Sequence, residues 1–324
     1  TLFKILYKLI IKAKVLSTFE SRKRSRELNE KLIKLALTSA AAISILTTFG
    51  ILFSILFEAI EFFKLRSFWY FITGATWSPG VIGSQFGALP IFAGTFVITI
   101  IALGVAIPVG LGSAIYMSEY ASANIRDYLK PLLEILAGIP TVVYGFFAAI
   151  TVAPLVVQIA EFFGLEATFN SALASGVVMG IMIIPVISSL SDDVIRAVPD
   201  SQRKAAFALG MTHGETIKNI VLPSAMPGII SASLLGLSKA LGETMIVVMA
   251  AGLRPNLSWN PLEDMTTVTV TIVNSLVGDF EFNSPETLSA FALGLILFVV
   301  TLILNMISLS LIRKFKEKYK VNTL

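Results

Sequence analysis

The sequence predicts an all-α membrane protein with about six transmembrane helices. Of its 324 residues, 55% are hydrophobic and only 14% are charged, whereas a soluble domain averages roughly 25% charged residues. Stretches with few or no charges recur along the chain, and each exceeds the ~20 residues that a helix needs to cross a bilayer. The expected spans are Leu35–Phe57, Leu89–Met117, Ile135–Ala160, Ala167–Ser191, Asn219–Leu253 and Thr287–Ile312.

The stretch between the first two spans is apolar but does not resemble a helix. It contains Trp69, Trp77, Pro79 and several glycines, and Gly and Pro interrupt helices while Trp prefers the headgroup level. We expect an external, interfacial or re-entrant segment here. The chain then divides into a basic segment 1–34, a first helix with its external end 35–66, the segment 67–88, a five-helix core 89–312 and a basic tail 313–324.

Lysine and arginine predict the orientation of the spans. Residues 1–34, the connections after the second and fourth spans, and the tail together hold 21 of these residues, against three on the other side and Lys239 within a span. Cytoplasmic loops carry the excess of basic residues, so both termini are expected inside the cell. The first 34 residues fit either an amphipathic helix on the inner leaflet or a solvated basic leader. The first span is too long for a signal-peptide core of about 7–15 residues, and we expect it to be retained.

The composition excludes several kinds of chemistry. The chain has no cysteine and a single histidine, His213, so thiol catalysis, disulfides and multi-histidine metal sites are ruled out. No G-x-x-x-x-G-K-[ST] phosphate loop occurs, and we expect neither ATP binding of that kind nor any cofactor. The positive net charge of +4 is explained by the membrane orientation and does not indicate nucleic acid.

The connection 192–223 is the most informative part of the sequence. Pro199 and Asp200 predict a helix start, and Ala205, Ala206 and Leu209 are expected on one face of that helix. Gly210 suits a helix end with positive φ. Thr212 and Glu215 form a capping-box pattern for a second short helix, which Pro223 is expected to end. Such a small-residue hairpin suits either docking of a partner or packing on the chain's own spans.

The spacing of Ala205, Ala206, Gly210, Ile220, Leu222 and Pro223 resembles the coupling loop of ABC importer permeases, in which E-A-A is followed by glycine and then by I-x-L-P. Lys204 stands where that family usually has glutamate. The segments LLEILAGIPTVVYG and LLGLSKALGETM, which begin at Leu132 and Leu234, resemble the PstC-type permease subunits of phosphate importers. The likeness covers roughly residues 90–320.

This resemblance implies a type I ABC importer permease fold and uptake of phosphate. It also implies the partners: a second homologous permease subunit, two ATPase subunits and an external phosphate-binding protein, assembled in the lipid bilayer. Its implied ATPase-coupling residues are Ala205, Ala206, Gly210, Leu222 and Pro223. Other oxyanions such as molybdate or sulfate, a membrane-embedded enzyme and a non-transporting assembly subunit are the alternatives.

Two charges fall within the expected fifth span. Lys239 and Glu243 are four residues apart and are expected to share a helix face. Charges inside a membrane usually face a cavity, so these two, with the adjacent Thr244, are the candidate residues of a translocation path. A structural pair that neutralises itself is the alternative. Glu134 is expected at the start of the third span, and Gly176 and Gly180 permit close helix packing, within the subunit or against a partner.

Overall fold

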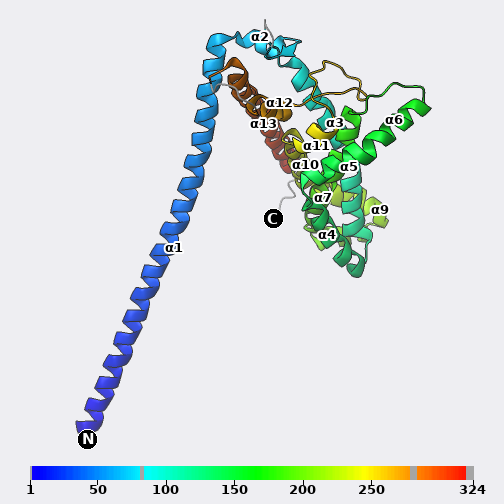
Figure 1. The fold of residues 1–324 in the computed structure, drawn as a ribbon. Coiled ribbons are helices and arrows are strands. Elements are labelled where there is room, and N and C mark those ends of the chain that lie inside the picture. Colours follow the sequence, from blue (N-terminus) through cyan, green and yellow to red (C-terminus); the bar gives the residue numbers. More distant parts are fainter. Residues whose placement is uncertain (1, 81–83, 278–282, 319–324) are drawn as a thin grey trace. The chain divides into compact units, whose positions relative to one another are not determined.

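The computed structural model describes residues 2–80, 84–277 and 283–318, and side chains within residues 30–314 of these ranges. The chain divides into two compact units, residues 1–57 and residues 58–324. The first unit consists of most of helix α1 (Leu2–Leu65). The described side chains begin at residue 30. The two interpretations of the basic segment 1–34, an amphipathic helix or a solvated leader, therefore lie almost entirely outside them. The second unit contains the helices from α2 onward, most of which are labelled in Figure 1.

The described residues include six helices or helical runs that are long and apolar enough to cross a membrane, as the sequence predicts. They are Glu30–Leu65, Leu89–Tyr120, Thr141–Phe162, Ala172–Arg196, His213–Leu241 and Pro285–Lys314. The helices of the second unit and their bounds are α2 (Phe68–Thr73), α3 (Leu89–Ile115), α4 (Ala123–Ala137), α5 (Thr141–Phe147), α6 (Ala153–Phe162), α7 (Ala172–Arg196), α8 (Asp200–Ala208), α9 (His213–Thr216), α10 (Leu222–Leu241), α11 (Met245–Ala250), α12 (Val268–Leu276) and α13 (Pro285–Lys318).

The segment before α3 is short and irregular, because its glycines and proline interrupt regular structure. It holds α2 and a two-stranded antiparallel hairpin of β1 (Trp77–Ser78) and β2 (Gln85–Phe86). Phe62, Phe71 and Phe86 are fully or almost fully buried, and their rings meet edge to face with centroids 5.1–5.5 Å apart. Edge-to-face contact is the favoured geometry for aromatic rings, and it anchors this segment to the end of α1.

Helices α3 and α7 pack backbone against backbone. A Cβ on Gly180 would lie 2.8 Å from the Ala102 carbonyl oxygen, and one on Gly176 would lie 2.7 Å from Ile101. The G-x-x-x-G pattern thus brings two spans of the same subunit together, which decides between the two uses that the sequence left open. The same contact continues at Gly110, where a Cβ would lie 3.0 Å from Ile187.

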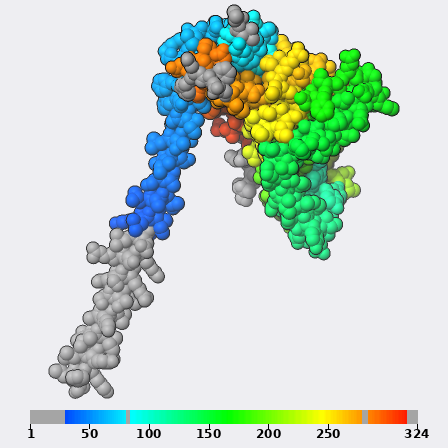
Figure 2. All heavy atoms as spheres, viewed as in Figure 1, coloured from blue at the N-terminus to red at the C-terminus, as the bar shows by residue number. Residues whose placement is uncertain are grey.

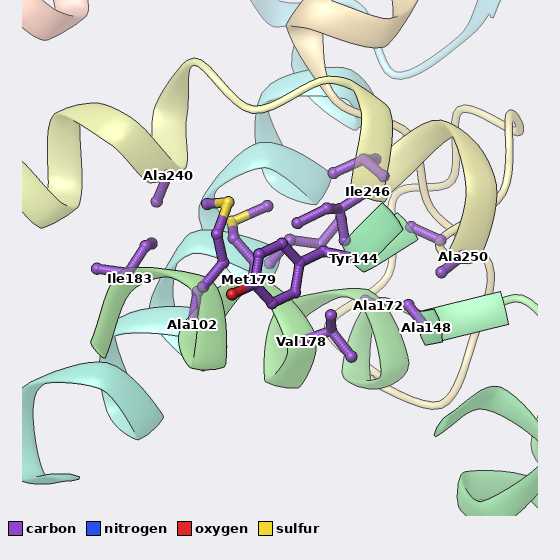
Figure 3. Close-up of a cluster of buried hydrophobic side chains, with 14 of the residues drawn as sticks. Ala102, Tyr144, Ala148, Ala172, Val178, Met179, Ile183, Ala240, Ile246 and Ala250 are labelled. Carbon is purple, nitrogen blue, oxygen red and sulfur yellow. The ribbon is translucent and has the colours of Figure 1, made fainter. Parts of the chain in front are cut away.

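The main core surrounds α7 (Figure 3). Buried side chains of α3, α5, α7, α10 and α11 meet there, among them Ala102, Tyr144, Met179, Ile183, Ala240 and Ile246. The Tyr144 hydroxyl donates a hydrogen bond to the Leu136 carbonyl, at 2.9 Å, so the one polar atom of this ring in the core has a partner. Alanine is frequent in the cluster, since small residues let helices in a membrane approach closely.

The third span begins later than the sequence predicts. The chain leaves α4 at Gly138, and α5 begins at Thr141 after Pro140. The residue before a proline is disfavoured in helical conformation, so the expected continuous helix from Ile135 is wrong. Glu134 therefore lies in the last turn of α4, exposed, and not at the start of a span.

The fifth span is interrupted. Helix α10 ends at Leu241, and Gly242 to Thr244 separate it from the short α11. The expected span Asn219–Leu253 is therefore wrong as a single helix. Pro223 does not end a helix, contrary to the prediction. It lies in the first turn of α10, where its missing N–H needs no partner, and the π-helical turn η3 (Ile217–Val221) joins α9 to α10.

Two further π-helical turns interrupt the spans. They are η1 (Tyr116–Tyr120), which follows α3, and η2 (Ala148–Val152), which joins α5 to α6. Like η3, η2 is followed by one residue and then a proline, Pro154. Isolated π turns in helices are rare and occur frequently at functional sites.

Candidate translocation and coupling sites

Glu243 lies in the break of the fifth span and binds backbone groups. Its carboxylate oxygen Oε1 accepts hydrogen bonds from the N–H groups of Met245 and Ile246, at 3.0 and 3.3 Å. These N–H groups open α11 and have no partner within the helix. The side chain is only 8% exposed, so the helix start stabilises a buried carboxylate, and the carboxylate caps the helix.

Lys239 does not pair with Glu243. The break places Glu243 beyond the end of α10, so the prediction of a shared helix face is wrong. Lys239 is partly buried in the last turn of α10. Within the described part of the chain, no ion pair or hydrogen bond joins its ammonium group to another side chain.

Threonines surround the break. Thr269 Oγ1 donates to the Glu243 carbonyl oxygen at 2.7 Å and lies 3.0 Å from Thr267 Oγ1. Thr95 on α3 accepts a hydrogen bond from Val268 N at 3.0 Å. Thr244 is partly buried and precedes α11 without a side-chain cap bond. Threonine hydroxyl groups thereby join the start of α12 to the break and also to α3.

Sequence reasoning missed these threonines. The signal was present in the stretch from Thr266 to Thr271, where four of the six residues are threonines beside an apolar helix.

The connection after α11 is hydrogen-bonded to the start of α7 and to the segment that precedes it. Its residues Pro261, Leu262 and Glu263 accept backbone hydrogen bonds from Leu173, Thr168 and Ala172 at the start of α7. In Figure 2 this yellow segment lies against the green helices. Hydrogen bonds from Asn256, Ser258 and Asn260 lower the pKa of the Glu263 carboxyl. A lowered pKa in the fold means that these bonds stabilise the loop above the ordinary carboxyl pKa and are lost as the pH falls through the lowered value.

The two alanines of the coupling segment point in different directions. Ala206 is 3% exposed, whereas Ala205 is exposed and Leu209 is 80% exposed. The prediction that Ala205, Ala206 and Leu209 share one face is therefore wrong. Ala206 packs against the chain itself, and the free face of α8 carries Ala205, Phe207, Ala208 and Leu209.

The turn after α8 has the predicted geometry. Gly210 has φ +84°, and a Cβ there would meet no atom within 4 Å. Left-handed backbone favours glycine, so the conformation and not the space selects this residue. Thr212 and Glu215 form the predicted capping box in both directions. Leu222 is partly buried against Ala114, Ile195 and Val221, and Pro223 is also partly buried.

Arg203 joins α8 to the second span. Its Nη2 donates to Glu119 Oε1 at 2.9 Å and to the Ile195 carbonyl at 3.0 Å, and its Nη1 donates to the Val198 carbonyl. The Arg203 side chain is 16% exposed and that of Glu119 is 5% exposed. His213 lies beside this pair, with Nε2 3.2 Å from the Glu119 carbonyl and its ring against Tyr120. The sequence alone contained no signal for a pair 84 residues apart.

A second ion pair ties α4 to α7. Arg126 Nη2 lies 2.8 Å from Asp192 Oδ2, and the Asp192 side chain is 1% exposed. Lys130 and Asp193 form a parallel, more exposed pair at 2.6 Å. Buried charges need such partners. Together with Arg203 and Glu119, these residues form what we call the polar cluster at the end of α7. The described residues include no group of three His, Cys, Asp or Glu side chains that could hold a metal ion.

The family model described as "Binding-protein-dependent transport system inner membrane component" matches residues 106–317. The chain belongs to this family. It is 32% identical over 303 residues to the probable ABC transporter permease protein YqgH of Bacillus subtilis (strain 168), covering 93% of this chain and 95% of that one. It is 34% identical to the phosphate transport system permease protein PstC of Mesorhizobium japonicum, covering 83% and 86%.

Solved structures show the same fold. The inward-facing MetNI methionine ABC transporter matches with a TM-score of 0.51 and 17% identity, covering 70% of this chain and 94% of that one. A bacterial ABC transporter involved in the import of alginate matches with a TM-score of 0.54 and 14% identity, covering 82% and 96%. The chain is thus a multi-pass inner membrane component with the type I ABC importer permease fold, and its relatives are transport subunits, not enzymes.

Proposed function

We propose that this chain is the permease subunit of an ATP-driven importer that moves inorganic phosphate into the cytoplasm. The observation that carries the proposal is the match to phosphate transport permeases named PstC, at about a third identity along most of the chain. The family relationship supports a transport role, and the break around Glu243 supplies a polar site inside an apolar bundle.

The proposed complex contains a second homologous permease subunit, two ATPase subunits and an external phosphate-binding protein. The chain has no phosphate loop for ATP, so hydrolysis is assigned to the separate ATPase subunits. The face of α8 formed by Ala205, Ala208 and Leu209 is the proposed docking surface, because it is exposed and small apart from Leu209. Ala206, Gly210, Leu222 and Pro223 position this face through packing and backbone geometry.

The proposed orientation has both termini and residues 192–223 in the cytoplasm and residues 254–286 outside. The distribution of lysine and arginine supports it, with 21 of these residues on the proposed cytoplasmic side and three on the other. The polar cluster at the end of α7 then lies near the cytoplasmic surface, where its more exposed pair, Lys130 and Asp193, is accessible to water. Lys239, Glu243 and Thr244 lie near the middle of the membrane, in the proposed translocation path.

The proposed substrate is tested with the reconstituted complex. Phosphate, sulfate and molybdate are offered separately, each with its own binding protein, and both ATP hydrolysis and uptake are measured. Stimulation by phosphate with its binding protein, and not by the other two anions, is the expected result. Stimulation by sulfate or molybdate, and not by phosphate, would mean that the substrate is another oxyanion. Hydrolysis without any uptake would contradict the transport function.

A further inference from the structure

A cavity of about 310 Å³ opens between α10 and α13. Its walls carry Leu234, Leu235, Leu309 and Ile312, together with four polar side chains: Ser231, Ser238, Asn305 and Ser308. Both helices are candidate membrane spans. Asn305 is nine residues before Lys314, which places it about 14 Å along the helix from that charge. The cavity therefore lies along the apolar part of the two helices, in the half nearer to α8. It is open to the surface of the subunit, where Ser231, Ser238 and Asn305 are exposed.

Three of the four polar side chains of this cavity, Ser238, Asn305 and Ser308, differ from the other hydroxyls of the two helices. Thr301 and Ser310 on α13 donate to carbonyls of their own helix, as do Ser231 and Ser233 on α10. Within the described residues, no hydrogen bond reaches the side chains of Ser238, Asn305 or Ser308. Ser308 is only 4% exposed, and its side chain lines the cavity without a hydrogen-bond partner among the described residues.

An unpaired polar group in hydrocarbon is unfavourable by several kcal/mol, roughly, so such groups face protein or a water-filled space. The exposed face of α10 extends this polar surface in both directions. Ser224, Ser231 and Ser238 follow one another at seven-residue intervals, all exposed, and Ser224 Oγ lies 3.1 Å from Gln202 Oε1 on α8. At its other end the stripe reaches Lys239 and the break before α11.

We propose that the α10–α13 cavity is a wall of the aqueous translocation path and donates hydrogen bonds to the transported oxyanion. This inference rests on the proposed function. The donors are the Ser238 and Ser308 hydroxyls and the Asn305 amide. They are neutral, in contrast to the ammonium group of Lys239 near the break. A permeation site must bind its ion weakly enough to release it, and neutral donors on the cytoplasmic side of a cation satisfy this requirement.

The test uses the absence of cysteine from the chain. Ser238→Cys and Asn305→Cys are introduced separately into the complete complex and treated with a charged, membrane-impermeant methanethiosulfonate. Ile303→Cys is the control, since Ile303 is half exposed on α13 and lies on the opposite face, about 200° from Asn305. A thiol reacts as thiolate, which forms in water and not in lipid, so we expect reaction about tenfold or more faster at Ser238 and Asn305 than at Ile303.

Phosphate with its binding protein and ATP is expected to slow the reaction at Asn305→Cys. Rates equal to that of Ile303→Cys, at rest and during ATP hydrolysis, would overturn the proposal and would mean that lipid or a helix of the second permease covers the cavity. If another oxyanion slows the reaction and phosphate does not, the substrate assignment fails while the wall of the path is retained. Asn305→Asp provides a functional readout: its carboxylate repels the anion, so uptake should fall, and Asn305→Gln should restore it.

Discussion

Arg203 of the coupling segment and Glu119 at the end of the second span form a largely buried ion pair, 2.9 Å from Nη2 to Oε1. The pair connects α8, the proposed docking helix, to the π turn η1 that follows α3. Because α3 packs on α7 through glycine contacts, we expect this pair to transmit a displacement of α8 to both spans.

Removing one partner of this pair should destabilise the subunit. It should also uncouple ATP hydrolysis from phosphate transport. Breaking a buried ion pair is unfavourable by about 3–5 kcal/mol, and the partial exposure of Arg203 places Arg203→Ala toward the lower end. Thermal unfolding of the purified subunit measures the first effect, and phosphate imported per ATP hydrolysed measures the second. The exchange of charges, Arg203→Glu with Glu119→Arg, should restore part of both.

The exposed pair Lys64–Glu61 provides the control for this experiment, since both side chains are more than half exposed. Exposed ion pairs contribute about 0–1 kcal/mol, so Lys64→Ala should unfold at nearly the same temperature as the unaltered chain. An Arg203→Ala subunit with unaltered stability and unaltered coupling would show that the pair has no part in transmission.

Glu243 has two separable roles, as a cap and as a charge. Glu243→Ala removes the acceptor for Met245 N and Ile246 N and should reduce stability by about 1–2 kcal/mol, as the loss of a helix cap does. Glu243→Gln keeps one acceptor oxygen, so its stability should be close to normal while phosphate uptake falls. Uptake is compared on membranes with equal amounts of protein. Normal uptake in the Gln variant would restrict Glu243 to capping α11.

Gly180 should not tolerate a side chain. A methyl group there would lie 2.8 Å from a backbone oxygen of α3, and overpacking of a core is unfavourable by about 1–3 kcal/mol. We expect Gly180→Ala to lower the unfolding temperature. Gly104→Ala on α3 is the matched control because no atom lies within 4 Å of its Cβ position. An equal response of the two variants would contradict the close packing of α7 on α3 at Gly180.

Ala205 and Ala206 should respond differently to a large side chain. Ala205→Trp leaves the fold intact, because Ala205 is exposed, but holds the ATPase away from α8. Ala206→Trp inserts a ring where 3% of the residue is exposed, and the segment itself should be disordered. Capture of the ATPase subunit measures docking, and limited proteolysis of the segment measures its folding. Normal capture with Ala205→Trp would exclude this face of α8 as the docking surface.

Single cysteines test the proposed orientation. Leu257→Cys, in the loop after α11, should react with an impermeant thiol reagent applied to intact cells, whereas Ser201→Cys in α8 should react only after the membrane is opened. Both side chains are exposed, so accessibility to the reagent is comparable. The reverse pattern would invert the topology.

The sequence predicted the parts of this molecule that depend on composition and local chemistry. The number of spans follows from hydrophobic length. The end of α8 follows from Gly210 and the start of α9 from the Thr212–Glu215 box. The interruption at Gly242 was not predicted. The sequence is apolar on both sides of it, and one hydrogen bond that stabilises it comes from Thr269, which is 26 residues away from Glu243.

The candidate site was predicted only in part for the same reason. Glu243 was selected as a charge in a span. Its carboxylate in fact accepts hydrogen bonds from backbone N–H groups, which are free to donate only because the helix is broken. The burial of Ala206 and the Arg203–Glu119 pair depend on how α3, α7 and α8 meet. Periodicity along one segment contains no information about that arrangement.

The π turns η2 and η3 have a consequence for how this chain tolerates changes in length. A π turn holds one residue more than an α turn, so deleting one residue of η3 would leave the side chains of α10 pointing as before. The deletion would, however, leave Pro223 inside a continuous α-helix, which is unfavourable by about 3 kcal/mol or more. The additional residue and the proline are therefore expected to appear and disappear together as such sequences diverge, here and again at Pro154.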